Sequence, residues 1–225
     1  MRGDLLSRFC SRAARPSAVV VTLMVLTSAL SGCWLAAADQ RMRGKEVTAE
    51  YLGLENKSVA IVIFTDQALV NEFPDARAEI SGFLANQMRS SLPTTRLLAP
   101  KDVIAWQDET INWFGLSESD IGQHFGVDRV LMIELLNYST TSRGGVGDLQ
   151  GNIRATAKIF EVDKLSQLPA WRGVFDVSWP KDGPVDVART NESVVRQRTL
   201  EMFASRVTGR LFTHREMDKP IRTRE

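Results

Sequence analysis

The residues best suited to chemistry are the two cysteines, Cys10 and Cys33, because a thiol is intrinsically very nucleophilic. Cys33 follows the small residues Ser31 and Gly32, which end an uncharged, largely apolar stretch over residues 18–30. At the end of such a stretch the thiol is placed to accept a group at a membrane. Both cysteines precede residue 34, so the rest of the chain can form no disulfide within itself.

Residues 1–32 resemble the signal of bacterial lipoproteins, with an arginine-rich start, an apolar run and Leu30-Ser31-Gly32-Cys33, which is similar to a lipobox. The resemblance implies that the signal is removed, that the thiol of Cys33 receives a diacylglyceryl group, and that its new α-amine is acylated. One acyl chain anchors only marginally, whereas two or three hold a protein stably. Trp34, rather than aspartate, follows the cysteine, which favours the outer membrane under the enterobacterial sorting rule.

An uncleaved signal anchor is the alternative. Residues 16–38 carry no charge and are just long enough to span a bilayer. Small and polar residues, among them Ser28 and Gly32, make the second half of that span poor, so the lipoprotein interpretation is favoured.

The charge balance argues against a nucleic-acid partner. The whole chain has 28 basic and 27 acidic side chains. Residues 1–32 hold four arginines and one aspartate, so the remainder has 24 basic and 26 acidic side chains, a formal charge of −2. A weakly acidic domain lacks the broad basic surface that nucleic acid requires.

No other cluster indicates catalysis or a metal. The two histidines, His124 and His214, have no cysteine or acidic neighbour at ligand spacing, and no G-x-S-x-G elbow occurs. Acidic pairs such as Asp108/Glu109 and Glu118/Asp120 occupy expected turn and cap positions. We therefore expect no metal, no cofactor and no enzyme activity.

One aromatic pair, Trp113-Phe114, follows the polar stretch QDETIN and is a candidate contact for a partner; core packing is the alternative. The glycines of residues 144–147 lack the Lys-Ser/Thr of a phosphate loop, so residues 139–150 are predicted to form a plain mobile loop.

The pattern predicts four segments. They are a signal over residues 1–32, a tether over 33–57 packed locally through Tyr51 and Leu54, a domain over 58–214, and a disordered charged tail over 215–225. The tether could instead carry a partner-binding motif.

Continuous apolar runs and strict alternation predict strands, and 3.6-residue periodicity between cap signals predicts helices. The expected strands cover residues 58–64, 95–98, 129–138, 153–159 and 171–179. The expected helices cover residues 74–92, 100–106, 117–126 and 190–211. This order predicts a single two-layer α+β sandwich, a mixed sheet with a C-terminal antiparallel meander packed by helices.

The segment Gly126-Val127-Asp128-Arg129-Val130-Leu131, a strand pair ending near Phe160-Glu161-Val162-Asp163, and Trp171 form a recurring pattern. It resembles the periplasmic domains of penicillin-binding-protein activator lipoproteins, the curli secretion lipoprotein and the amino-terminal domain of the Tol translocation protein. Over residues 58–212 the resemblance implies an α+β fold and a non-catalytic, protein-binding role.

The leading hypothesis is a lipid-anchored lipoprotein on the periplasmic face of the cell envelope, whose domain binds another envelope protein as an accessory or scaffold. The alternatives are a hydrolase or transferase acting on envelope polymer, and a subunit of a secretion or transport assembly.

Overall fold

The computed structural model describes residues 45–141, 147–163 and 168–216 of the chain. Val47–His214 form one compact unit. Within the described residues, no helix combines the length and the apolar character needed to cross a membrane. The signal and Cys33 lie outside the described residues.

The described residues outside this compact unit, Lys45, Glu46, Arg215 and Glu216, belong to a second unit. Strands β1 (Lys45–Val47) and β8 (His214–Glu216) pair with each other as a separate two-stranded sheet, which sequence periodicity did not predict. Three residues are too few to show a period.

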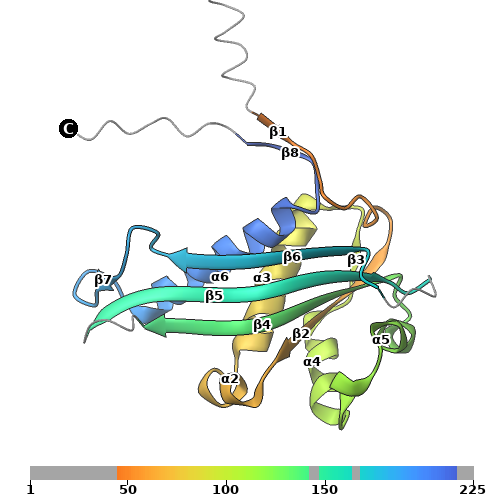
Figure 1. Cartoon of the computed structure of the whole chain (residues 1–225), viewed down its shortest axis with the longest axis horizontal. Coiled ribbons are helices and arrows are strands. Elements are labelled where there is room, and N and C mark those ends of the chain that lie inside the picture. The colour runs from red at the N-terminus through yellow and green to blue at the C-terminus, as the bar shows by residue number, and fades with distance from the viewer. Residues whose placement is uncertain (1–44, 142–146, 164–167, 217–225) are drawn as a thin grey trace, which may run out of the picture. The chain divides into compact units, whose positions relative to one another are not determined.

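A six-stranded mixed sheet organises the compact unit (Figure 1). The central strand β2 lies parallel to β3 and β4, whereas the β4–β5 and β5–β6 pairs are antiparallel. The spatial order is β3 (Arg96–Leu97), β2 (Ser58–Thr65), β4 (Arg129–Thr141), β5 (Asp148–Glu161) and β6 (Trp171–Trp179), with β7 (Val185–Asp186) pairing with β5.

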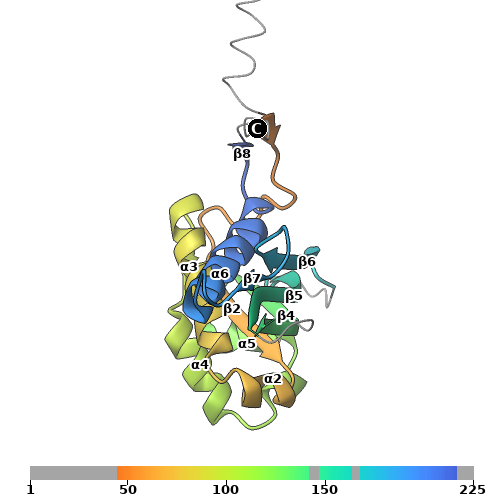
Figure 2. The same ribbon diagram turned by 90° about the vertical axis from the view of Figure 1, so that its left-hand side faces the viewer.

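Helices lie on both faces of this sheet. They are α2 (Gln67–Glu72), α3 (Ala76–Ser91), α4 (Pro100–Glu109), the 3₁₀ turn η1 (Trp113–Gly115), α5 (Glu118–Phe125) and α6 (Glu192–Gly209). Figure 2 shows α3 and α6 side by side, and both pack on the same face of the sheet. The predicted fold class, a mixed sheet packed by helices, is confirmed, but helices on both faces give three layers in place of the predicted two.

The run SVAIVIF is apolar throughout because β2 is covered on both faces. Ile61 and Ile63 enter the main core beneath α3 and α6, whereas Ala60 and Val62 enter a second core beneath α4 and α5. The main core is completed by large buried side chains from both helices, including Ile80, Leu84, Met88, Phe203 and Val207.

Cap signals are present at the bounds of two of the predicted helices, those over residues 117–126 and 190–211. Ser117 and Asp120 form a capping box at the start of α5, and Gly126 ends that helix with φ +61°. The side chain of Asn191 caps α6 by accepting a hydrogen bond from the backbone N–H of Val194. These motifs depend on a few neighbouring residues, so they can be identified without the tertiary structure.

The predicted loop over residues 139–150 is too long. β4 continues to Thr141 and β5 begins at Asp148, so both ends of that segment belong to strands. Thr140 is buried and donates a hydrogen bond to Glu192 (2.8 Å), while Leu149 is buried and pairs with Val185 of β7. Contacts with Glu192 and β7, which lie outside the β4–β5 hairpin, therefore extend both strands beyond their apolar residues.

Candidate functional site

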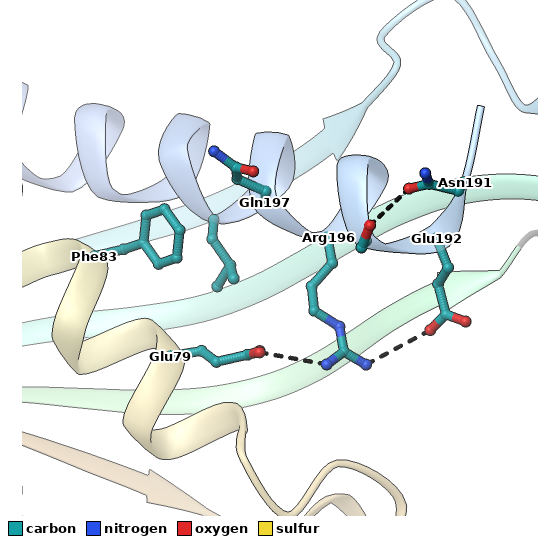
Figure 3. A pocket seen from close by; sticks show the side chains of 8 residues that line it. Glu79, Phe83, Asn191, Glu192, Arg196 and Gln197 are labelled. Atoms are coloured by element: carbon teal, nitrogen blue, oxygen red, sulfur yellow. Dashed lines mark hydrogen bonds and ion pairs between the residues drawn. The ribbon is translucent and has the colours of Figure 1, made fainter.

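A groove of about 630 Å³ lies where the start of α6 passes α3 (Figure 3). Arg196 of α6 reaches across to Glu79 of α3 (3.3 Å) and also lies 3.6 Å from Glu192, one turn earlier on its own helix. Phe83 and Leu200 supply apolar walls.

The polar side chains of this groove are engaged with one another. Tyr138 donates a hydrogen bond to Glu79 (3.3 Å), and burial together with the charge of Glu79 raises the pKa of the phenol. Burial acts to lower the pKa of Arg196, but Glu79, Tyr138 and Glu192 together outweigh it, so the net shift is upward. These contacts connect α6 and β4 to α3, so the polar side chains of this groove stabilise the packing of these elements.

A second pocket, of about 550 Å³, lies at the carboxyl end of β2, where the chain leaves the central parallel strand. Ligands in open α/β sheets commonly bind in the crevice at the carboxyl ends of parallel strands. Its lining residues come from β2, α2, α3, α4 and η1 and are Phe64, Thr65, Asp66, Gln67, Val70, Arg77, Gln107, Asp108, Trp113 and Phe114.

Three of those lining residues carry buried polar atoms that lack a hydrogen-bond partner: Thr65 Oγ1, Arg77 Nε and Gln107 Oε1. The amide orientation of Gln107, only 4% exposed, is set because its Nε2 donates to the carbonyl of Ile63 (3.0 Å). Arg77 is held at its other end by Asp108 (2.6 Å). A buried polar group without a hydrogen-bond partner costs free energy. This pocket contains three such groups, whereas the charged side chains of the groove at α6 are paired.

Three exposed apolar side chains lie in and next to η1, Ile111, Phe114 and Leu116, which we call the Phe114 surface; Phe114 also lines this pocket. Their exposed fractions are 90%, 64% and 43%. Asn112 takes the left-handed conformation at φ 59°, which asparagine tolerates better than most residues.

Trp113 is half-buried in an aromatic cluster beside the Phe114 surface. Its ring lies edge-on to Phe64 (6.2 Å between centroids) and 6.2 Å from the ring of Trp106. Core packing, the alternative for the Trp113-Phe114 pair, therefore describes Trp113, whereas Phe114 is exposed and stays a predicted partner contact. The pocket residues Arg77 and Gln107 were not predicted. The available signal was the polar Gln107, four residues after Val103 on the buried face of α4.

The histidines and acidic pairs occupy structural positions. His124, in the last turn of α5, stacks on Trp106 (5.2 Å between ring centroids), and the Nδ1 of His214 lies 3.1 Å from the carbonyl oxygen of Phe212, which can only accept a hydrogen bond. Asp120 belongs to the capping box and Asp108 pairs with Arg77. Within residues 45–141, 147–163 and 168–216, no group of three or more potential ligands is placed to hold a metal ion.

Asp128, in the glycine–valine–aspartate–arginine segment, joins the starts of β2 and β4. Its carboxylate accepts hydrogen bonds from the backbone N–H and the hydroxyl of Ser58, both at 2.8 Å, and these bonds hold the pKa of Asp128 below its ordinary value. This side chain therefore aligns two parallel strands.

Arg129, 5% exposed, is the buried centre of a network at the same end of the sheet. Its guanidinium donates to the hydroxyl of Tyr51 (3.0 Å), the carbonyl of Asp128 (2.7 Å) and the carboxylate of Asp163 (2.8 Å), and it lies 3.5 Å from Glu161. Burial and the hydrogen bond to Glu161 raise the pKa of Tyr51 to about 12. The predicted local packing of Tyr51 and Leu54 is confirmed.

No protein-family model matches the chain, and no curated protein matches it. Among solved structures it is similar to the PelC dodecamer from Paraburkholderia phytofirmans, with 15% identity, a TM-score of 0.42, and coverage of 72% of this chain and 93% of that one. Lipoprotein GNA1162 from Neisseria meningitidis gives 16% identity, a TM-score of 0.44, and coverage of 68% and 95%. A minor lipoprotein from Acinetobacter baumannii gives 8% identity, a TM-score of 0.37, and coverage of 72% and 99%.

Two of these three proteins are named as lipoproteins. Likeness at this level shows no family for the chain and carries no inference about its activity. None of the three is a family that the strand motif resembles, so that resemblance remains a prediction.

Proposed function

We propose that the protein is a lipid-anchored envelope lipoprotein whose α+β domain binds another envelope protein without catalysing a reaction. The lipid is placed on Cys33, after cleavage behind Gly32, on the periplasmic face of the outer membrane. The observation that carries the binding role is the Phe114 surface beside a pocket with unpartnered polar atoms.

Three large apolar side chains within six residues are exposed at this surface. Covering a leucine-, isoleucine- or phenylalanine-sized side chain is worth about 1.5–3 kcal/mol. Aromatic anchors beside pockets are typical centres of protein interfaces. Covering Ile111 and Phe114 together would therefore contribute about 3–6 kcal/mol to binding, before the entropic cost of association is subtracted.

The anchor is tested by the variant Cys33→Ser. Because the compact unit begins at Val47 and contains no cysteine, we expect the variant to keep its circular dichroism spectrum and to move from the membrane fraction to the soluble fraction. A variant that stays in the membrane fraction would mean that residues 16–38 span the bilayer, and the lipoprotein interpretation would be wrong.

The binding role is tested with a photo-crosslinking amino acid placed at Phe114 in living cells. The matched control carries the same group at Val174 of β6, which is 58% exposed and does not line the pocket. We expect one discrete crosslinked protein from position 114 and none from position 174. The same product from both positions, or no product from position 114, would overturn the proposal, as would turnover of envelope polymer by the purified protein.

A further inference from the structure

We propose that the pocket at the carboxyl end of β2 receives a basic side chain, carried by the partner segment that docks on the Phe114 surface. The inference rests on the proposed function and deepens it, because it names the chemistry of the partner. Its support comes from the charge, the aromatic walls and the unpartnered polar atoms of the pocket.

The pocket lining is acidic overall. Its charged side chains are two carboxylates, Asp66 and Asp108, and one guanidinium, Arg77. Arg77 is only 18% exposed and is already paired with Asp108, whose own side chain is 54% exposed. An incoming carboxylate would therefore meet two like charges and one engaged arginine, whereas an incoming cation meets a net negative site.

The aromatic walls favour the same ligand. Phe64, Trp113 and Phe114 all line the pocket, and successive rings lie 6.2 Å and 6.4 Å apart. A cation near the face of tryptophan or phenylalanine is attracted by the negative charge of the ring face. Apolar walls next to exposed carboxylates fit the long stem and charged head of lysine or arginine.

The unpartnered atoms extend the match to a peptide. Gln107 Oε1 is an acceptor and Arg77 Nε is a donor, and both atoms are shielded from solvent, so an incoming peptide can bond them only when side chains of the lining move aside. Gln107 is more than nine-tenths buried and lines the pocket. A peptide with a basic residue supplies the donor, the acceptor and the cation together.

The test uses three blocked dipeptides with the purified whole chain in detergent. They are N-acetyl-leucyl-arginine amide, the citrulline analogue, in which a neutral urea replaces the guanidinium, and the glutamate analogue. The chain is labelled with 5-fluorotryptophan, and ¹⁹F NMR follows its five tryptophans, with Trp113→Phe assigning the resonance of interest. We expect the arginine peptide to shift the Trp113 resonance and to bind roughly two- to fivefold more tightly than the citrulline peptide, with the preference shrinking in 1 M salt.

A matched pair of variants assigns the preference to the pocket. Asp66→Asn removes one charge but keeps an oxygen that can cap α2, as Asp66 does for Leu69 (2.8 Å). Asp176→Asn removes the same charge from β6, outside the pocket. The preference for arginine should fall about twofold or more in the first variant and stay unchanged in the second.

The outcomes separate this inference from the proposed function. Equal binding of arginine and citrulline, tighter binding of glutamate, or no shift of Trp113 with any peptide would each overturn the basic ligand. If position 114 still crosslinks a protein in those cases, the binding role stands and only the chemistry assigned to the partner is wrong. If position 114 crosslinks nothing, the proposed function fails whatever the peptides do.

Discussion

Replacing Arg129 by methionine should cost about 3–4 kcal/mol of unfolding free energy. Methionine keeps an unbranched apolar stem but removes the guanidinium from among its four partners. Glu161 is 10% exposed at its side chain and would keep a charge that has lost its arginine, a situation that typically costs 3–5 kcal/mol. Asp163 is 54% exposed, so its lost ion pair adds at most about 1 kcal/mol.

The measurement is urea denaturation of the Cys33→Ser chain, followed by circular dichroism. A loss of about 3 kcal/mol leaves a domain of ordinary stability, about 5–15 kcal/mol, mostly folded, so both baselines can be recorded. The slope m should not change if the two folded states are equally compact.

The double variant Arg129→Met/Glu161→Gln decides the cause. It removes the stranded charge, so we expect it to recover about 1–2 kcal/mol relative to Arg129→Met alone. If the double variant is no more stable than Arg129→Met, the loss comes from the hydrogen bonds and packing of the arginine itself. A loss below about 1 kcal/mol in the single variant would refute the reasoning, because the network would then be worth no more than a surface pair.

Two further predictions concern alkaline pH and glycine packing. Tyr51 and Tyr138 are the chain's two tyrosines and both have raised pKa values, so absorbance at 295 nm should show no phenol ionising near pH 10 in the folded protein, whereas both should ionise there in guanidinium. A phenol whose pKa is raised in the folded state stabilises the fold fully at pH values below its unfolded pKa, near 10. The free energy of unfolding should therefore fall as the pH rises through about 12 for Tyr51. A normal titration of either tyrosine in the folded protein would contradict the raised pKa values. Gly122→Ala in α5 should destabilise by about 1 kcal/mol, because its new methyl group collides with Val162 and this overpacking exceeds the gain in helix propensity. Gly82→Ala in α3, with open space around it, should stabilise by up to about 1 kcal/mol, and equal thermal shifts in the two variants would be inconsistent with this packing.

The parts of the fold that sequence reasoning predicts are those determined locally. The apolar run of β2, the capping box of Ser117 and Asp120, and the glycine that ends α5 each depend on a few adjacent residues. The ends of the β4–β5 hairpin depend instead on Glu192 and β7, far along the chain, so polar strand residues were mistaken for a loop. Short elements such as α2 and β7 are below the length at which a period can be recognised.

The candidate site is predictable only in part, for the same reason. Trp113 and Phe114 can be predicted as a candidate partner contact, because two aromatic residues follow a polar stretch. The pocket itself needs five elements to converge on the end of β2, and nothing near Arg77 in the sequence indicates that its Nε lies buried without a partner. Gln107 could have been noticed, because a polar side chain on the apolar face of a helix must find a partner or a function.

The two ends of β2 differ in their polar contacts: hydrogen bonds that stabilise the sheet lie near Ser58, whereas the pocket lies near Thr65. Near Ser58, the Asp128 and Arg129 networks bind Tyr51 and align the parallel strands, so this end carries the stabilising polar contacts where the chain joins the sheet. Near Thr65, about 23 Å further along the strand at ~3.3 Å per residue step, polar atoms are left without partners and apolar side chains face solvent. Buried polar atoms without partners lower stability, so we expect the proposed partner, bound at the Thr65 end, to raise the free energy of unfolding by linkage. The contacts that hold the sheet at the Ser58 end should be unchanged by that binding.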